Sequence, residues 1–272
     1  MTSVNHPVYI VTTGYRNGLW NMAFDMSLMD LFRKGIFQEQ FGRQSMLWRF
    51  YAWDPPALSI GHGQRRTDID ETACSMKGID IVRRPTGGRA VLHIDEFTYA
   101  CLAETAAANT HFSAMIHGII RHALLGFGVK AEFKRTQPDM RKRYSTAESA
   151  SCFTASARNE LHVEGRKLVG SAQRRSDRVI LQHGSLLLSG RHKLIATLLE
   201  CKDPAVPGRI QEDLEKKTVS VQEVTGVIPD FNSLCSAMIE SIKTRLKKRV
   251  IILTEQELTS LFTCKSALSG RL

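Results

Sequence analysis

Short hydrophobic runs separated by turn-forming residues dominate the first two-thirds of this 272-residue chain. The runs are rich in valine, isoleucine, leucine and aromatic residues, and they are too short for typical helices, so they favour β-strands. They lie at residues 8–12, 46–51, 57–60, 79–83, 90–93, 98–103, 159–163, 167–172 and 179–188. The pattern predicts many short strands joined by turns.

Two segments within this part of the chain show a longer hydrophobic period. Over residues 112–127 the hydrophobic positions recur every three or four residues, which predicts an amphipathic helix that ends at the following glycines. Residues 24–32 show the same spacing, and Asn21 is the expected N-cap of that helix. We therefore expect helices interspersed among the strands.

The last third of the chain is expected to be helical. Asp230 is a suitable N-cap for one helix, and Thr254 with Glu257 forms a capping box before another. Strands at hairpin spacing with separate helices predict an α+β fold, with a mixed, largely antiparallel sheet flanked by helices. No linker or repeat divides residues 1–272, so we expect one domain, with a motif-bearing core at about 20–190 and a helical part at about 191–272.

Composition indicates an ordinary globular protein, with 43% hydrophobic and 24% charged residues. No hydrophobic run approaches the ~18 residues of a membrane span, and the N-terminus lacks a signal-peptide pattern. The six cysteines are widely separated and form no C-x-x-C pair, which argues against a zinc or redox motif. We expect a cytoplasmic protein with free thiols and no bound metal.

Basic residues outnumber acidic residues by 37 to 27, for a net charge of +10. This surplus favours an acidic partner, which on charge alone could be nucleic acid, an anionic membrane or an acidic protein. Part of the surplus is clustered, at 134–135, 141–143, 174–175 and 247–249, although each cluster taken singly fits a solvated surface equally well. Neither a Rossmann fingerprint nor a P-loop motif is present in the sequence.

The first candidate functional segment is 83–93, RRPTGGRAVLH, in which a strand runs into a proline and two glycines and then resumes. Gly87 and Gly88 allow unusual backbone angles and close approach of a ligand to the main chain. Arg84 and its neighbouring arginines suit an anionic or carbonyl-bearing ligand. A plain hairpin turn with exposed arginines explains the same pattern equally well.

A second candidate segment contains Cys152, which lies among serine, threonine and alanine residues instead of in a hydrophobic run. A cysteine acts as a nucleophile in its thiolate form, which nearby positive charge favours. A tight turn at 164–165 would bring Lys167 to the start of a returning strand, and Gly170 marks another close approach. An inert loop cysteine is the ordinary alternative.

Three motifs in order resemble the superfamily of biotin and lipoate protein ligases and octanoyltransferases. They are Asn21-Met22-Ala23 with Asp25, the 84–93 segment, and the 165–173 segment. Within that superfamily, 86–93 followed by Glu96, Thr98 and Tyr99, together with 151–153 and 179–185, resembles the LipM-type octanoyltransferases. The run 154–157 departs from that type, where more proline and aromatic character is expected.

The resemblance implies a ligase-like fold without an accessory ligase domain and without a cofactor. It implies that Cys152 accepts the acyl group and that Lys167 contacts the acyl carbonyl. It also implies that Arg84, Thr86, Gly87, Gly88, His93 and Gly170 line the acyl site. His93 fits either proton transfer or a structural hydrogen bond at a strand end.

The implied reaction moves an octanoyl group from octanoyl-acyl carrier protein to a lysine of a lipoyl-domain protein. Such acceptors include the glycine cleavage H protein and the 2-oxoacid dehydrogenase E2 subunit. Acidic partners of this kind would explain the +10 charge without nucleic acid or a membrane. Three alternatives remain at this stage: an ATP-dependent lipoate ligase, an amidotransferase between lipoyl-domain proteins, and a non-catalytic nucleic-acid binder.

Overall fold

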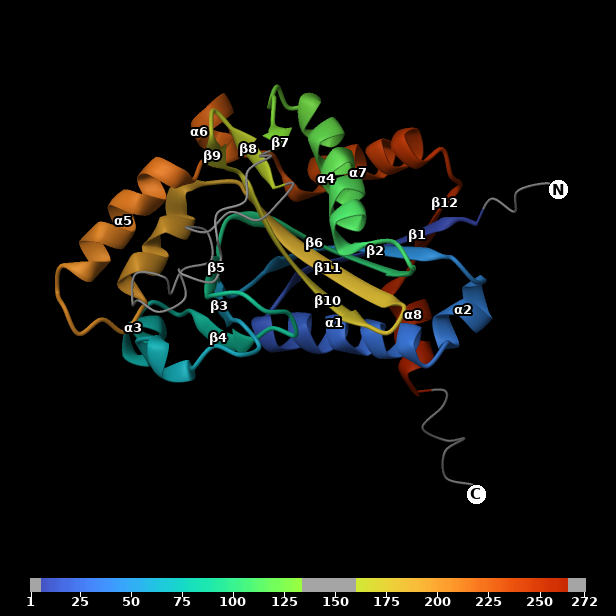
Figure 1. Ribbon diagram of the computed structural model, residues 1–272, viewed down its shortest axis with the longest axis horizontal. Coiled ribbons are helices and arrows are strands. Elements are labelled where there is room, and N and C mark those ends of the chain that lie inside the picture. The colour runs from blue at the N-terminus through green and yellow to red at the C-terminus, as the bar shows by residue number, and fades with distance from the viewer. Residues whose placement is uncertain (1–5, 134–159, 264–272) are drawn as a thin grey trace, which may run out of the picture.

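The computed structural model describes residues 6–133 and 160–263, and a six-stranded sheet forms its centre (Figure 1). The order of strands across the sheet is β10–β11–β6–β2–β1–β12. Their bounds are β1 (Val8–Arg16), β2 (Met46–Trp53), β6 (Glu96–Glu104), β10 (Val169–Ser176), β11 (Val179–Leu187) and β12 (Val250–Leu253). Pairing is antiparallel from β10 to β2 and parallel from β2 to β12, which confirms the predicted mixed, largely antiparallel sheet.

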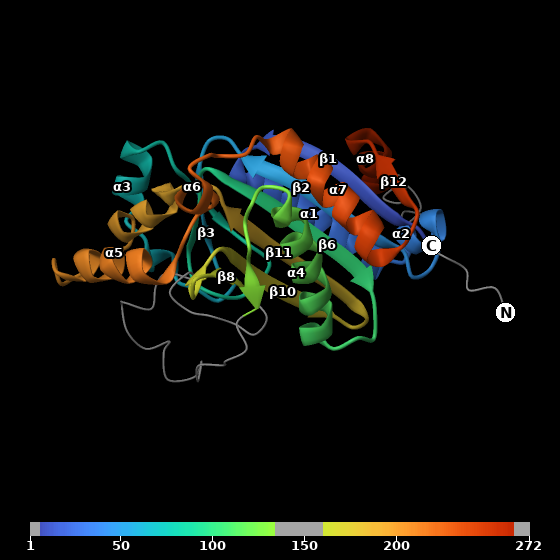
Figure 2. The ribbon, with the colours of Figure 1, turned by 90° about the horizontal axis from the view of Figure 1, so that it is seen from above.

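Helices cover both faces of this sheet (Figures 1 and 2). On one face, α4 (Asn109–Leu125) lies beside α7 (Phe231–Leu246); on the other lie α1 (Gly18–Arg33), α2 (Ile36–Phe41) and α8 (Glu255–Thr263). Strand β2 shows how the two cores form: Trp48 and Phe50 join the core beneath α4 and α7, whereas Leu47 and Tyr51 join the core over α1. Because alternate side chains point to opposite faces, a strand covered on both sides is almost continuously hydrophobic.

A second sheet, in the order β4–β3–β5, lies beside the main sheet. It consists of β3 (Ala57–Ile60), β4 (Asp80–Arg83) and β5 (Val91–His93), and it packs against η5 (Gly190–Thr197). The surrounding elements are η1 (Arg66–Asp68), α3 (Glu71–Met76) and α5 (Val206–Lys217), whereas α6 (Val221–Thr225) packs through Val221 into the core beneath α4 and α7. A third small sheet comprises β7 (Glu132–Phe133), β8 (Leu161–Val163) and β9 (Arg166–Lys167).

The predicted start of the first helix is wrong. Asn17, not Asn21, caps α1, because its side chain accepts a hydrogen bond from the backbone N–H of Trp20. Asn21 lies inside the helix, fully buried, and its side-chain amide donates to the backbone carbonyls of Arg16 and Ala52. This residue therefore joins the start of α1 to the ends of β1 and β2.

The C-terminal third is mainly helical, as predicted, but it also contributes β12 to the main sheet. Both predicted caps are present: Asp230 accepts from the backbone N–H of Ser233, and Thr254 and Glu257 hydrogen-bond each other's backbone N–H groups. No helix within 6–133 and 160–263 combines the length and the hydrophobicity needed to cross a membrane.

Candidate active site

An open pocket lies where the three sheets meet. Four of the predicted site residues line it: Arg84, His93, Lys167 and Gly170. The remaining lining residues are Met22, Tyr51, Trp53, Ser59, Val91, Thr98, Ser171, Ala172, His183, Gly184 and Ser185. The pocket thus combines large apolar side chains with hydroxyl groups and three kinds of basic side chain, in a space that suits an acyl chain and its carbonyl.

Lys167 enters the pocket from a tight hairpin. Glu164 and Gly165 both have positive φ angles, of 50° and 76°, as a two-residue type I′ turn requires, and the turn pairs His162 with Lys167. The Lys167 Nζ atom lies 2.8 Å from Glu160 Oε1, and both side chains are only 3% exposed. The predicted turn is therefore present, and it presents a buried ammonium group to the pocket.

The segment after β4 is not a hairpin, because β4 and β5 pair with opposite edges of β3. The buried Arg84 guanidinium holds this segment in place by donating to the backbone carbonyls of Ser59, Gly87 and Arg89. Much of its hydrogen-bonding capacity is thus used by the protein backbone. Arg84 both shapes the loop and borders the pocket.

The two glycines of this loop lie outside the pocket lining. Gly88 has a φ of 96°, and a Cβ atom added to Gly61 would lie 1.9 Å from its carbonyl oxygen. A close approach was predicted at Gly87 and Gly88. At Gly88 it is an approach between two backbone segments of the protein, those of Gly88 and Gly61. Thr86 lies beside the pocket, where its hydroxyl is 2.6 Å from His183 Nε2.

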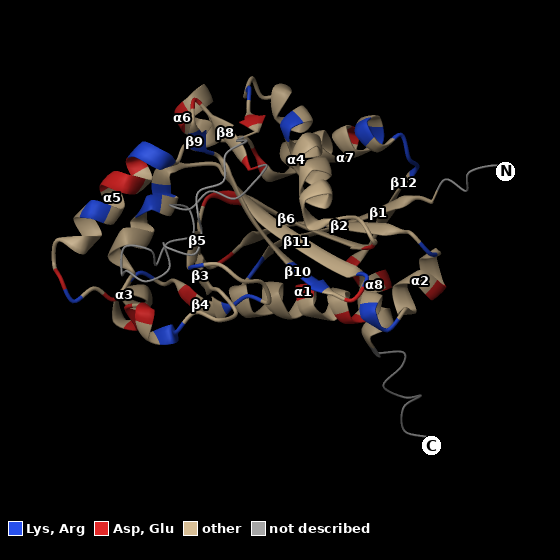
Figure 3. Ribbon diagram, viewed as in Figure 1, with Lys and Arg blue, Asp and Glu red and all other residues tan. Residues whose placement is uncertain are grey.

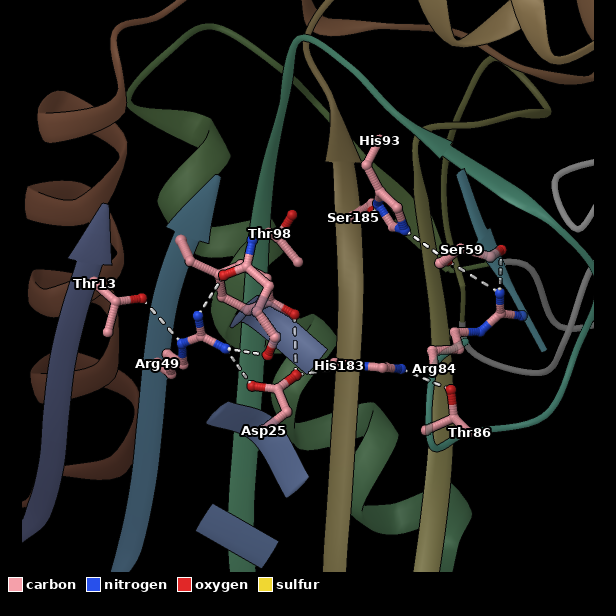
Figure 4. Close-up of polar contacts among 12 residues, drawn as sticks. Thr13, Asp25, Arg49, Ser59, Arg84, Thr86, His93, Thr98, His183 and Ser185 are labelled. Carbon is pink, nitrogen blue, oxygen red and sulfur yellow. Dashed lines mark hydrogen bonds and ion pairs between the residues drawn. The ribbon is translucent and has the colours of Figure 1, made fainter. Parts of the chain in front are cut away.

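His93 is held by contacts with three residues, of which Ser59 is seen in Figure 4. Its ring stacks on Trp53 with the ring centres 4.0 Å apart. Its Nδ1 atom is 2.7 Å from Glu96 Oε1, and its Nε2 atom is 2.7 Å from Ser59 Oγ. A carboxylate accepts only, so Nδ1 carries the hydrogen and Nε2 accepts from the serine hydroxyl.

His183, on β11, also has a carboxylate beside its ring, as His93 does. Its Nδ1 atom lies 3.3 Å from Asp25 Oδ2. Burial lowers the pKa of His183, and the Asp25 carboxylate only partly opposes that effect. Asp25 is itself ion-paired with Arg49, at 2.6 Å between Oδ1 and Nη1, and both side chains are fully buried. Burial raises the pKa of Asp25, but Arg49 and His183 outweigh it, so the pKa is below its usual value.

Several pocket residues had no assigned role from sequence reasoning, notably Ser59, Trp53 and His183. The available signal was polar residues within an otherwise apolar strand, since Gln182, His183 and Ser185 interrupt the hydrophobic β11. Cys152, the predicted nucleophile, lies outside the described residues.

Comparisons with known proteins identify the family of the chain. Residues 17–243 match the model of the lipoyl protein ligase A/B catalytic domain. The chain is 38% identical to the octanoyltransferase LipM of Geobacillus kaustophilus over 222 residues, which cover 79% of this chain and 77% of that protein. It is 34% identical to the octanoyltransferase LipM of Kyrpidia tusciae over 248 residues, covering 89% and 88%.

Solved structures confirm the predicted fold. The bipartite lipoate protein ligase of Thermoplasma acidophilum superposes with a TM-score of 0.71 at 17% identity, covering 96% of this chain and 94% of that one. A lipoate-protein ligase A bound with ATP gives a TM-score of 0.67 at 18% identity, covering 97% and 96%. At these identities the structures establish the fold alone, whereas the family match spans most of the sequence. The chain belongs to the lipoyl protein ligase A/B catalytic domain family.

Proposed function

We propose that this protein is an octanoyltransferase that receives an octanoyl group from acyl carrier protein on Cys152 and passes it to a lysine of a lipoyl-domain protein. The octanoyltransferases LipM among its relatives support the overall reaction. The archaeal ligase of similar fold was solved as part of a lipoylation system with its E2 lipoyl domain, which supports acceptors of that kind. The glycine cleavage H protein is a second proposed acceptor.

The first step forms the acyl-enzyme. The Cys152 thiolate attacks the carbonyl carbon of the octanoyl thioester, a new C–S bond forms, and the carrier's thiolate leaves. In the second step the acceptor amine attacks, a C–N bond forms, and Cys152 is released. Covalent catalysis of this type divides one transfer between two proteins into two steps at one site. Thioester exchange is nearly neutral in free energy and amide formation is downhill, so ATP is not required.

The observation that best supports this proposal is the buried Lys167 ammonium at the pocket wall. A charged donor in a site of low dielectric stabilises the oxyanion that develops when either nucleophile attacks. Its partner, Glu160, follows Cys152 after a short stretch of sequence. Of the other residues proposed for the acyl site, Arg84, His93 and Gly170 line the same pocket, Thr86 lies beside it, and Gly87 and Gly88 belong to the loop that Arg84 holds.

The apolar wall of the pocket accounts for the proposed acyl substrate. Met22, Tyr51, Trp53 and Val91 line one part of it. Burial contributes ~0.8 kcal/mol for each methylene group of an acyl chain, so such a wall favours a medium-length chain over acetyl. The absence of a cofactor requirement is part of this proposal.

Acidic partners and a cytoplasmic location belong to the same proposal. The four described cysteines are free thiols, as expected in a reducing compartment. The net charge of +10 suits an acidic carrier or lipoyl domain, so neither nucleic acid nor a membrane is needed to explain it. We propose that residues 1–272 act as one catalytic domain.

Three assays separate this proposal from its alternatives, all with an octanoylated donor, a lipoyl domain and mass detection of the octanoylated acceptor. Transfer from octanoyl-acyl carrier protein without ATP is the expected result. Activity with free octanoate only when ATP is added would instead identify a ligase. Transfer from an octanoylated lipoyl domain, with none from acyl carrier protein, would identify an amidotransferase.

A further inference from the structure

Two hydrogen-bonded chains of the same kinds of group border the pocket, and Figure 4 shows His93 and Ser59 of one and all three members of the other. Each joins a carboxylate, an imidazole and a hydroxyl group. One runs from Glu96 through His93 to Ser59, with both separations 2.7 Å. The other runs from Asp25 through His183 to Thr86, at 3.3 Å and 2.6 Å. The two carboxylates differ in whether a basic side chain neutralises their charge, and this difference separates the roles of the two chains.

In the second chain the carboxylate charge is already neutralised. Asp25 binds the Arg49 guanidinium at 2.6 Å and also accepts from the Tyr51 hydroxyl at 3.0 Å. Little of its charge remains to stabilise an imidazolium, and burial lowers the pKa of His183. His183 therefore serves as a neutral group that fixes Thr86.

In the first chain the carboxylate charge is not neutralised. Glu96 Oε1 accepts from the hydroxyls of Thr98 and Ser185, at 2.6 Å and 2.8 Å, and faces His93. Its Oε2 atom is buried and has no hydrogen-bond partner among the described residues. No Lys or Arg of the described chain forms an ion pair with Glu96. The Glu96 carboxylate thus lies 2.7 Å from His93 Nδ1 without a Lys or Arg partner in the described part of the chain.

The proposed reaction needs such a group, because the lysine of an acceptor protein arrives as an ammonium ion. It must lose a proton before its nitrogen attacks the acyl carbonyl. Lys167 Nζ lies 2.8 Å from Glu160 Oε1, and its proposed role is to donate to the carbonyl oxygen. His93 is connected to the pocket through Ser59, which lines it.

We infer that Ser59, His93 and Glu96 form a proton relay for amide formation, a step that rests on the proposed function. Ser59 Oγ takes up one proton from the incoming ammonium as it passes its own proton to His93 Nε2, which leaves a neutral amine and a neutral serine, while Glu96 stabilises the imidazolium. The amine nitrogen then forms the C–N bond, the C–S bond breaks, and the second nitrogen proton goes to the departing Cys152 thiolate. The imidazolium finally releases its proton to solvent. Ser59 touches the substrate, whereas His93 and Glu96 act through it.

Other charged groups around His93 do not replace this pair. Arg84 contacts Ser59 Oγ at 3.2 Å, and Lys167 lines the same pocket, so the other charged groups on this side are both basic. Glu160 and Asp25 are already ion-paired, with Lys167 and Arg49. Glu96 is thus the carboxylate that contacts the His93 ring.

The test measures amide formation separately from acylation. Octanoyl-enzyme is prepared from wild type, His93→Gln and Glu96→Gln, and a lipoyl domain is added in single-turnover experiments from about pH 5.5 to 9, a range that includes the ordinary histidine ionisation. The wild-type rate should rise with pH and then level off. The His93→Gln rate should be lower by about 10²-fold near neutral pH and should keep rising, because solvent must remove the proton. Glu96→Gln, which keeps an acceptor for His93, should lie between the two.

Two controls make the outcome specific. Hydroxylamine is neutral at pH 7 and needs no relay, so it should cleave all three octanoyl-enzymes at the same rate. His122→Gln, on α4 and hydrogen-bonded to Ser241 outside the pocket, should behave as wild type. Wild-type pH profiles for both relay variants, or equal losses with hydroxylamine and lysine, would overturn the relay. Failure of wild type to form an octanoyl-enzyme would instead refute the proposed function itself.

Discussion

Lys167 and Glu160 form a buried ion pair in which each side chain compensates the charge of the other. Each side chain is 3% exposed, and their atoms are 2.8 Å apart. Removing one member of a buried ion pair leaves an uncompensated charge and typically costs about 3–5 kcal/mol of unfolding free energy. A simple replacement of Lys167 therefore changes stability and chemistry together.

We expect Lys167→Ala to slow acylation of Cys152 by about 10²–10³-fold, the usual effect of removing one oxyanion donor. The free energy of unfolding should also fall. The acylation rate is measured by rapid quench and intact mass, and stability by urea unfolding.

The double variant Lys167→Met with Glu160→Gln separates the two effects, because it removes both charges. Its stability should recover toward that of wild type while acylation stays slow. Recovery of the acylation rate along with stability would show that Lys167 is a structural residue only.

At the scale of elements, the buried Asp25–Arg49 pair joins α1 to β2. Arg49 also donates to Thr13 on β1 and to Asn21 on α1, so one guanidinium connects three elements on one side of the sheet (Figure 4). Met22 of α1 and Tyr51 of β2 line the pocket. The same network therefore holds the helix against the sheet and shapes the acyl site.

This network predicts how stability depends on pH. The pKa of Asp25 is lower in the folded protein than its value of 3.8 in an unfolded chain, so its ionised form stabilises the fold above that pH. That contribution is lost as pH falls below 3.8 through the folded pKa. Asp25→Asn should therefore lower the unfolding free energy at pH 7 by about 3–5 kcal/mol and flatten its acid dependence.

Unfolding by urea at a series of acidic and neutral pH values measures this effect. Asp30→Asn, on the same helix and paired with Arg33 at the surface, is the matched control and should change stability little. An Asp25→Asn variant with the acid dependence of wild type would contradict the assigned role of the pair.

The strands of the main sheet were predictable because their hydrophobic runs are local and strong, as in 46–51 within β2. The beginning of α1 was not. Asn21 is a good capping residue by type, but its partners Ala52 and Arg49 belong to a distant strand, and Asn17 offered the same chemistry one turn earlier. β12 was missed because its short run lies within a segment dominated by helices.

The candidate site, too, was predictable from the sequence only in part. Arg84, His93, Lys167 and Gly170 were expected at the site, and the structure brings them to one pocket. The contacts of His93 with Ser59 on β3 and Glu96 on β6 depend on how strands pair, which the spacing of residues does not reveal. The position of Cys152 relative to the pocket stays a prediction.

At the scale of the whole molecule, the basic residues that give the net charge of +10 differ in what they contact. Along α5, basic and acidic side chains occur together (Figure 3), and Lys216 and Lys217 pair with acids one turn earlier. Arg174 and Arg175, predicted as a basic cluster, donate to the backbone carbonyls of Pro85, Thr105 and Ala107. That cluster is therefore partly structural.

We expect the reaction with octanoyl-acyl carrier protein to be sensitive to salt. The Debye length falls from ~10 Å at 0.1 M to ~3 Å at 1 M, so attraction between a basic enzyme and an acidic carrier weakens. The result should be a lower kcat/KM, mainly through a slower association rate. An octanoyl pantetheine thioester lacks the acidic surface and is the matched control. Equal salt dependence for both donors would leave the basic surplus without a role in docking.

The central claim, an acyl group carried on Cys152, is tested most directly by the intact mass of the protein after incubation with octanoyl-acyl carrier protein in the absence of ATP. We predict the gain of one octanoyl group, mapped by peptide analysis to Cys152 and absent from Cys152→Ser, since a serine hydroxyl is barely ionised at neutral pH. An adduct mapped to Cys74 or Cys101, or octanoylation of the lipoyl domain by Cys152→Ser at the wild-type rate, would contradict the account.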